Sequence, residues 1–117
     1  MKLPDAVLIR HILYECEKIL KLTSSISYEE FQNSTTYQDA VIRPLEVIGE
    51  AAGNLSDEFL QNHSDVPIAN MKGMRNLLAH QYFRVDLETV WITATRDIPP
   101  AYSLLQKISE DSKKEYH

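Results

Sequence analysis

The sequence has few of the residues that build disulfide-rich, loop-rich or membrane-spanning proteins. Among its 117 residues are one cysteine, three glycines and five prolines. The single cysteine, Cys16, cannot form an internal disulfide, which favours a reducing compartment. No apolar run approaches the roughly 20 residues of a membrane helix, and the N-terminus meets polar residues too early for a secretory signal. We therefore expect a cytoplasmic protein without membrane contact.

Basic residues are also scarce, because 12 lysines and arginines stand against 17 acidic residues, for a formal net charge of −5. This balance argues against a general nucleic-acid coat protein, which would carry a basic excess. It allows an RNA-cutting enzyme whose few basic groups are concentrated at one place. The length suits a single compact domain over residues 1–117, and the 44% hydrophobic content is typical of a globular chain.

Helical periodicity runs through the whole sequence, with apolar residues recurring at three- and four-residue steps and almost no strand signal. The predicted helices cover residues 4–22, 28–32, 35–54, 57–62, 67–82 and 87–112. Pro99 and Pro100 are expected to kink or divide the last of these helices. The polar tail is expected to fray from about residue 111. The prediction is an all-α, up-and-down bundle of four to six helices.

Several local patterns support these boundaries and suggest helix contacts. Ser27 and Glu30 have the spacing of a capping box, and Asp86 is placed to cap the last helix. Gly49 weakens a helix, so we expect it to permit the close approach of another helix. Glu50, its neighbour, could pair with Arg75 across helices or be a helix-surface carboxylate, and the sequence leaves both readings open.

The stretch "RNLLAHQY", at 75–82, gives one helix two different sides. With about 100° of rotation per residue, its polar groups fall on an arc of about 160°: Arg75, Asn76, His80 and Tyr82. The apolar residues fall on the opposite side and are expected to enter the core: Met71, Met74, Leu77 and Leu78. One short segment thus displays four polar groups away from the core.

Each of these side chains is suited to a phosphodiester. Arg75 offers a planar, permanently charged fork that matches phosphate oxygens. His80 can exchange a proton near neutral pH, since an unperturbed histidine has a pKa of about 6.5. Asn76 can orient the imidazole or bind a phosphate oxygen. Tyr82 can donate to an oxyanion or stack on a base.

The same residue types also have structural explanations. An arginine on a helix is usually solvated or salt-bridged, and a histidine near a helix C-terminus often only interacts with the helix dipole. A tyrosine such as Tyr82 is often half-buried packing. Moreover, Arg75 and His80 lie about 140° apart around the axis. We infer that they converge in a groove shared by two copies of the chain, which predicts a homodimer.

A family resemblance favours the catalytic reading. "GMRNLLAHQY" resembles the signature of the HEPN superfamily, specifically its HepT-like toxins: arginine, four residues, histidine, one residue, tyrosine. Arg75, His80 and Tyr82 match this signature without a gap, and Asn76 matches the polar residue that commonly follows the arginine. "AVIRPLEVIGEAAGNLS" and "VDLETVW" also resemble segments before and after the motif. The resemblance covers roughly residues 5–110.

The resemblance implies a metal-independent endoribonuclease toxin of a type VII-like toxin–antitoxin pair, without a cofactor. His80 would be the general acid/base, Arg75 would hold the phosphate, and Asn76 would support the site. The RNA 2′-hydroxyl would attack the adjacent phosphate and leave a cyclic phosphate. The implied partner is an MntA-like minimal nucleotidyltransferase antitoxin, which would transfer AMP to Tyr82 and block the site. DNA is not an expected partner.

Two alternatives remain from the sequence. The dimer could be a non-catalytic module that binds a nucleotide or the nucleotidyltransferase partner without cutting RNA, as the acidic balance and the few lysines near the motif would allow. A purely structural helical bundle is the other alternative, although the complete motif argues against it. Loss of RNA cleavage on replacing His80, with the fold intact, would separate the enzyme from both.

Overall fold

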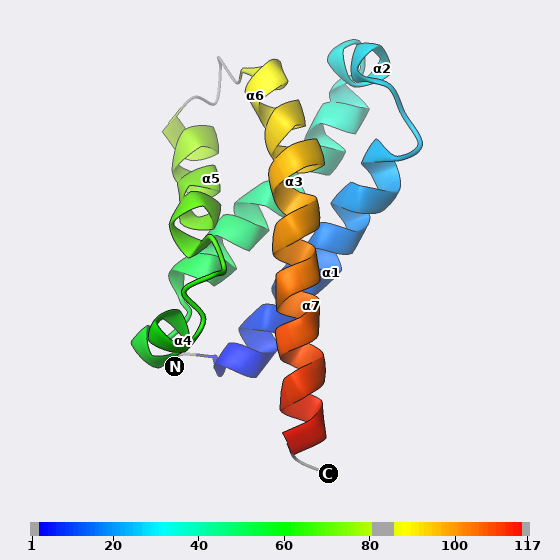
Figure 1. Cartoon of the computed structure of the whole chain (residues 1–117). Helices are drawn as coiled ribbons and strands as arrows, with labels where there is room; N and C mark the ends of the chain where they lie inside the picture. The colour runs from blue at the N-terminus through cyan, green and yellow to red at the C-terminus, as the bar shows by residue number, and fades with distance from the viewer. Residues whose placement is uncertain (1–2, 81–85, 116–117) are drawn as a thin grey trace.

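The protein is a bundle of helices (Figure 1). The computed structural model describes residues 3–80 and 86–115, and it describes their side chains except at 76–80 and 112–115. The first five helices are α1 (Asp5–Thr23), α2 (Tyr28–Gln32), α3 (Thr35–Gly53), α4 (Asp57–Asn62) and α5 (Ile68–His80). They are followed by α6 (Leu87–Ile92), the π-helical segment η1 (Thr93–Asp97) and α7 (Ile98–Glu115). The predicted all-α fold is confirmed, and no helix of the described ranges is long and apolar enough to cross a membrane.

Helices α2, α3, α4 and α6 begin where a side chain accepts from a free N–H group of the first turn. The Ser27 side chain accepts from the Glu30 N–H at 3.1 Å, and the Glu30 carboxylate accepts from the Ser27 N–H at 3.2 Å, so the predicted capping box is confirmed. Asp86 accepts from the N–H groups of Glu88 and Thr89 and caps α6 as predicted. The Thr89 hydroxyl also donates to Asp86, and this bond lowers the pKa of the carboxyl group.

The last predicted helix is divided, but not by a break at its prolines. Segments α6, η1 and α7 follow one another without a loop, and Pro99 and Pro100 lie in the first turn of α7 (Figure 1). A proline cannot donate to the carbonyl four residues earlier, and the helix adopts the wider π turn immediately before these two residues. Helix α7 continues to Glu115 through residues that tolerate a helix well, and the expected fraying from about residue 111 stays a prediction.

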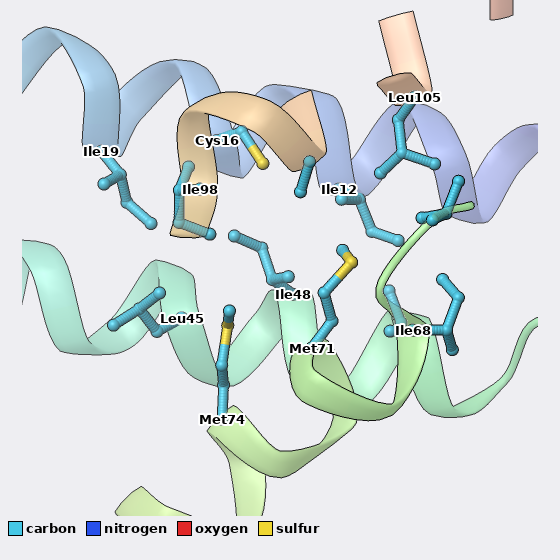
Figure 2. Close-up of a cluster of buried hydrophobic side chains, with 14 of the residues drawn as sticks. Ile12, Cys16, Ile19, Leu45, Ile48, Ile68, Met71, Met74, Ile98 and Leu105 are labelled. Carbon is cyan, nitrogen blue, oxygen red and sulfur yellow. The ribbon is translucent and has the colours of Figure 1, made fainter. Parts of the chain in front are cut away.

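Helix α3 lies at the centre of the bundle, packed against α1 on one side and α5 on the other, and α7 packs against α1 (Figure 1). Figure 2 shows how apolar side chains from these four helices meet in one core. Its fully buried members include Ile12, Cys16, Ile19, Leu45, Ile48, Met71, Ile98 and Leu105. The core fixes one side of α5, because Met71 and Met74 point into it as the sequence predicted.

Candidate functional site

The site begins where α3 and α5 come closest together. Gly49 of α3 is buried against the backbone of Arg75 in α5. A Cβ atom added at Gly49 would lie 2.7 Å from the Arg75 nitrogen and 2.8 Å from the Arg75 Cβ, both shorter than real contacts allow. The expected close approach at Gly49 is therefore confirmed, and the residue that it brings near is the motif arginine.

An ion pair forms immediately beside this contact. Nη1 of Arg75 donates to Oε2 of Glu50 at 2.8 Å, which is the length of a charge-assisted hydrogen bond. Both side chains remain open to solvent, with 51% of the Arg75 side chain and 60% of the Glu50 side chain exposed. The geometry thus shows that Glu50 pairs with Arg75, which the sequence left open. It directs one edge of the guanidinium toward α3 and leaves an accessible cation at the surface.

The other motif residues are placed by the backbone of α5. Asn76 and His80 lie on this helix, as predicted, but their side chains lie outside what the structure describes. Tyr82 and the predicted continuation of α5 beyond His80 lie outside the described residues. Five residues of one α-helix place His80 about 7.5 Å further along the axis than Arg75.

A pocket of about 500 Å³ opens beside the ion pair, between α1, α3 and α5. Leu8, Val47 and Ala51 supply apolar surface to its wall. Its polar lining comes from all three helices and consists of His11, Arg43, Glu46, Glu50, Asn54 and Arg75. The motif arginine therefore borders a concave surface that could hold part of a ligand.

Apart from Glu50, sequence reasoning missed the residues that share this pocket with Arg75. Arg43, Val47, Glu50 and Asn54 recur along α3 at steps of four, three and four residues, so they lie on one face of the helix. That spacing could have suggested a common surface. His11 belongs to α1 and reaches the pocket only through tertiary packing, so no local sequence signal could have predicted its position.

Comparison with known families gives a match over most of the chain. Residues 12–108 match the family model described as ribonuclease HepT-like. The matched range includes α3, the ion pair and the whole Arg75–His80 segment. The resemblance found at the motif therefore extends over the helices that position it.

Curated proteins of similar length match nearly the full chain. The protein is 39% identical over 113 residues to one from Caldanaerobacter subterraneus subsp. tengcongensis named "putative RNase", covering 97% of this chain and all of the relative. It is 41% identical over 100 residues to a Methanocaldococcus jannaschii protein with the same description, covering 86% of each. A Thermococcus cleftensis protein named "probable ribonuclease HepT" is 39% identical over 92 residues, covering 79% of this chain and 84% of the relative. No solved structure gave a significant match.

Proposed function

Because this chain belongs to the HepT-like ribonuclease family, we propose that it is a metal-independent endoribonuclease with Arg75 and His80 as its catalytic residues. One observation carries the proposal most directly. Arg75 is exposed at the mouth of a pocket, on the same helix that carries His80. An accessible guanidinium can stabilise phosphoryl charge, and an imidazole can exchange protons with the RNA.

The surroundings of Arg75 support a phosphate-binding role. Within the described residues its guanidinium makes one hydrogen bond, from Nη1 to Glu50. An arginine has five N–H donors, so most of its binding capacity is available to another anion. An exposed ion pair is worth only about 0.2–1 kcal/mol, and an RNA phosphate can therefore exchange with the Glu50 carboxylate at little cost.

The proposed reaction needs only the RNA and the protein side chains. The RNA 2′-oxygen forms a bond to the adjacent phosphorus while the bond from phosphorus to the 5′-oxygen breaks. The proton of the 2′-hydroxyl is removed, and a proton reaches the departing 5′-oxygen, with His80 as the general acid/base. Arg75 stabilises the charge that grows on the phosphoryl oxygens. The products are a 2′,3′-cyclic phosphate and a free 5′-hydroxyl.

The placement of the two residues also supports the proposed homodimer. The backbone positions of Arg75 and His80 lie about 140° apart around α5, and a single helix cannot close around a phosphate. Two copies related by a two-fold axis would bring both motifs to one groove. The pairing would also double the local number of cations in a chain whose formal charge is −5. Asn76, beside Arg75, is proposed to support this groove.

The test is cleavage of RNA by purified full-length protein in the presence of EDTA. His80→Ala should lower the rate by about 10²–10⁴-fold, as expected for loss of a general acid/base. Arg75→Ala should lower it by about 10²–10³-fold, as expected for loss of an oxyanion partner. Circular dichroism should show unchanged helix content in both variants. Equal cleavage by the wild type and His80→Ala would overturn the catalytic assignment.

We further propose that a minimal nucleotidyltransferase antitoxin regulates this site by transferring AMP to Tyr82. The support is the motif itself, since Tyr82 follows His80 by two residues. An adenylate there would place negative charge and bulk close to where the RNA phosphate binds. Electrostatic repulsion and steric blocking would then exclude the substrate.

Intact mass measured after coexpression with a cognate minimal nucleotidyltransferase tests this regulation. The mass should rise by whole multiples of one AMP unit, and the modified protein should lose RNA cleavage. Tyr82→Phe serves as the matched control, because it keeps the ring and removes only the hydroxyl acceptor. An unmodified Tyr82 beside an active nucleotidyltransferase would contradict the proposal without affecting the assignment of Arg75 and His80.

The non-catalytic module is the second candidate, and the neutral charge balance at the pocket favours it. Arg43 and Arg75 line the pocket together with Glu46 and Glu50, so two positive charges meet two negative charges. A protein that binds a nucleotide or the nucleotidyltransferase without cutting RNA would show saturable binding of that partner and no cyclic-phosphate product. The cleavage assay in EDTA therefore separates the two functions.

A further inference from the structure

The pocket beside Arg75 contains a second arginine that the proposed chemistry does not use. Arg43 of α3 lines the pocket, and 76% of its side chain is exposed. It lies seven residues before Glu50, the partner of Arg75, which corresponds to about 10 Å along the axis of α3. The two arginines enter the pocket from different helices, α3 and α5, so a bound RNA strand can meet them with two of its phosphates.

The rest of the pocket lining offers both polar groups and apolar surface, as a nucleotide site needs. His11 and Asn54 offer polar groups, and Leu8, Val47 and Ala51 offer apolar surface. The Asn54 amide already donates to the Glu50 carbonyl oxygen at 3.0 Å, so its position at the end of α3 is fixed. Polar groups can contact the ribose or the edge of a base, while the apolar wall covers its face.

Each arginine already has a carboxylate partner in the free protein. Nη1 of Arg43 lies 3.4 Å from Oε2 of Glu46, and the same atoms of Arg75 and Glu50 lie 2.8 Å apart. Both pairs are exposed, and such pairs are weak. A phosphate can take the place of either carboxylate, because the fork of an arginine matches phosphate and carboxylate equally well.

We propose that this pocket binds the nucleotide next to the scissile phosphate, with Arg43 as the contact to the neighbouring phosphate of the RNA strand. This inference rests on the proposed function of Arg75 and names a further binding residue for the same substrate. Glu46 limits the affinity by competing for Arg43. The pocket thus extends the substrate site from one protomer's motif along the face of α3.

The test is the salt dependence of binding between the full-length protein and a single-stranded RNA whose 2′-hydroxyls are all methylated, which prevents cleavage. Arg43→Gln should weaken binding by about three- to tenfold at low salt and lower the slope of log affinity against log salt by about 0.7, the value for one lost phosphate contact. The matched control is Arg96→Gln, since Arg96 is exposed on η1 and does not line the pocket. It should leave both quantities near the wild-type values.

A second pair of variants tests the competing carboxylate. Glu46→Gln should tighten RNA binding by a few-fold, whereas Glu29→Gln, an equal charge change on α2 outside the pocket, should have a smaller effect. Equal effects of Arg43→Gln and Arg96→Gln, on both affinity and salt slope, would overturn the inference. So would a wild-type chain that does not bind the methylated RNA.

The two proposals can fail separately. If ordinary RNA is cleaved and Arg43→Gln leaves KM unchanged, the function stands and the pocket assignment is wrong. If nothing is cleaved but Arg43→Gln still lowers the salt slope, the pocket binds RNA and the catalytic proposal is wrong. When both hold, Arg43→Gln raises KM and leaves kcat close to that of the wild type.

Discussion

Arg75 combines a rigid backbone with an accessible side chain. Its backbone is pressed against Gly49, where even one added carbon would clash, while half of its side chain is open to solvent. Glu50 holds one edge of the guanidinium without burying it. The contact with Gly49 fixes the backbone of Arg75 before the substrate arrives, which lowers the cost of ordering it during binding, while phosphate must displace the Glu50 carboxylate.

Replacing Glu50 should change the affinity for RNA while leaving the stability of the protein nearly unchanged. Glu50→Gln should change the free energy of unfolding by less than about 1 kcal/mol, because the ion pair is exposed. It should also lower KM for RNA, because a competing carboxylate is removed from Arg75. Urea unfolding and steady-state cleavage measure the two effects. A higher KM would mean that Glu50 orients Arg75 and does not compete with phosphate.

Cys16 differs from Arg75 in being completely shielded from solvent. Its burial in the core, helped by the nearby carboxylates of Glu17 and Glu15, raises the pKa of the thiol from 9.0 to about 12. The folded state therefore holds the thiol proton more tightly than the unfolded state does. This contribution to stability is complete below about pH 9 and is lost as the pH rises toward 12.

The reactivity of the Cys16 thiol should reflect its burial in the core. Cys16 should resist alkylation by iodoacetamide at pH 8 in the native protein and react readily in urea, since the reactive thiolate is disfavoured in the core. The free energy of unfolding should fall between pH 9 and pH 12 more steeply in the wild type than in Cys16→Ala. Fast alkylation of the folded protein would contradict the buried position.

The contact between α3 and α5 links local packing to the site. A buried glycine removes the side chain that would separate the two helices, and the motif helix then rests directly on α3. Met71 and Met74 enter the core on the same side of α5 (Figure 2). Packing on one side of α5 thus determines which residues the other side can present.

Alanine substitutions at two glycines should have opposite effects. Gly49→Ala should destabilise the protein by about 1–3 kcal/mol, because its Cβ would collide with the backbone of Arg75. Gly73→Ala should stabilise it by about 0.5–1 kcal/mol, because a Cβ there meets nothing within 4 Å and alanine favours a helix interior. Urea denaturation measures both values.

Cleavage assays on the same variants complete this comparison. Gly49→Ala should also reduce RNA cleavage at temperatures where it remains folded, because α5 must shift at Arg75. Gly73→Ala also adds one methyl group, but on α5 and without a clash. It should therefore retain cleavage close to the wild-type rate. Unchanged stability and activity in Gly49→Ala would show that the two helices can separate without consequence.

The whole molecule carries an acidic net charge, so several of its few cations must lie together to bind RNA. The formal net charge is −5, and two of the four charged groups at the pocket are carboxylates. Long-range attraction of RNA by one chain is therefore weak. A groove shared by two protomers would concentrate the arginines that bind phosphate.

Mixing two inactive variants tests whether the groove is shared. If each site takes Arg75 from one protomer and His80 from the other, a heterodimer of Arg75→Ala and His80→Ala contains one complete site. Random mixing should then restore about one quarter of the wild-type activity, since half of the dimers are mixed and each has one site of two. Sedimentation should give the mass of a dimer. No recovery in proven heterodimers would place both residues in one protomer.

The sequence by itself determined the helices, because their signals are local. Apolar periodicity located α1 through α5 to within about two residues wherever the boundary is described, and short-range caps at Ser27 and Asp86 marked two of the starts. The motif also followed from the sequence alone, since Arg75 and His80 are five residues apart on one helix. The π turn of η1 was missed because prolines show where hydrogen bonds are lost, but not how the chain accommodates the loss.

Only the tertiary structure decided what surrounds the motif. Whether Glu50 binds Arg75 depends on how closely α3 approaches α5, and that distance is set where Gly49 meets Arg75, 26 positions later in the sequence. His11 joined the same pocket for the same reason, because its separation in sequence from α3 and α5 carries no information about a shared cavity. Local periodicity determines which face of a helix is buried, while the assembled core decides which exposed faces meet.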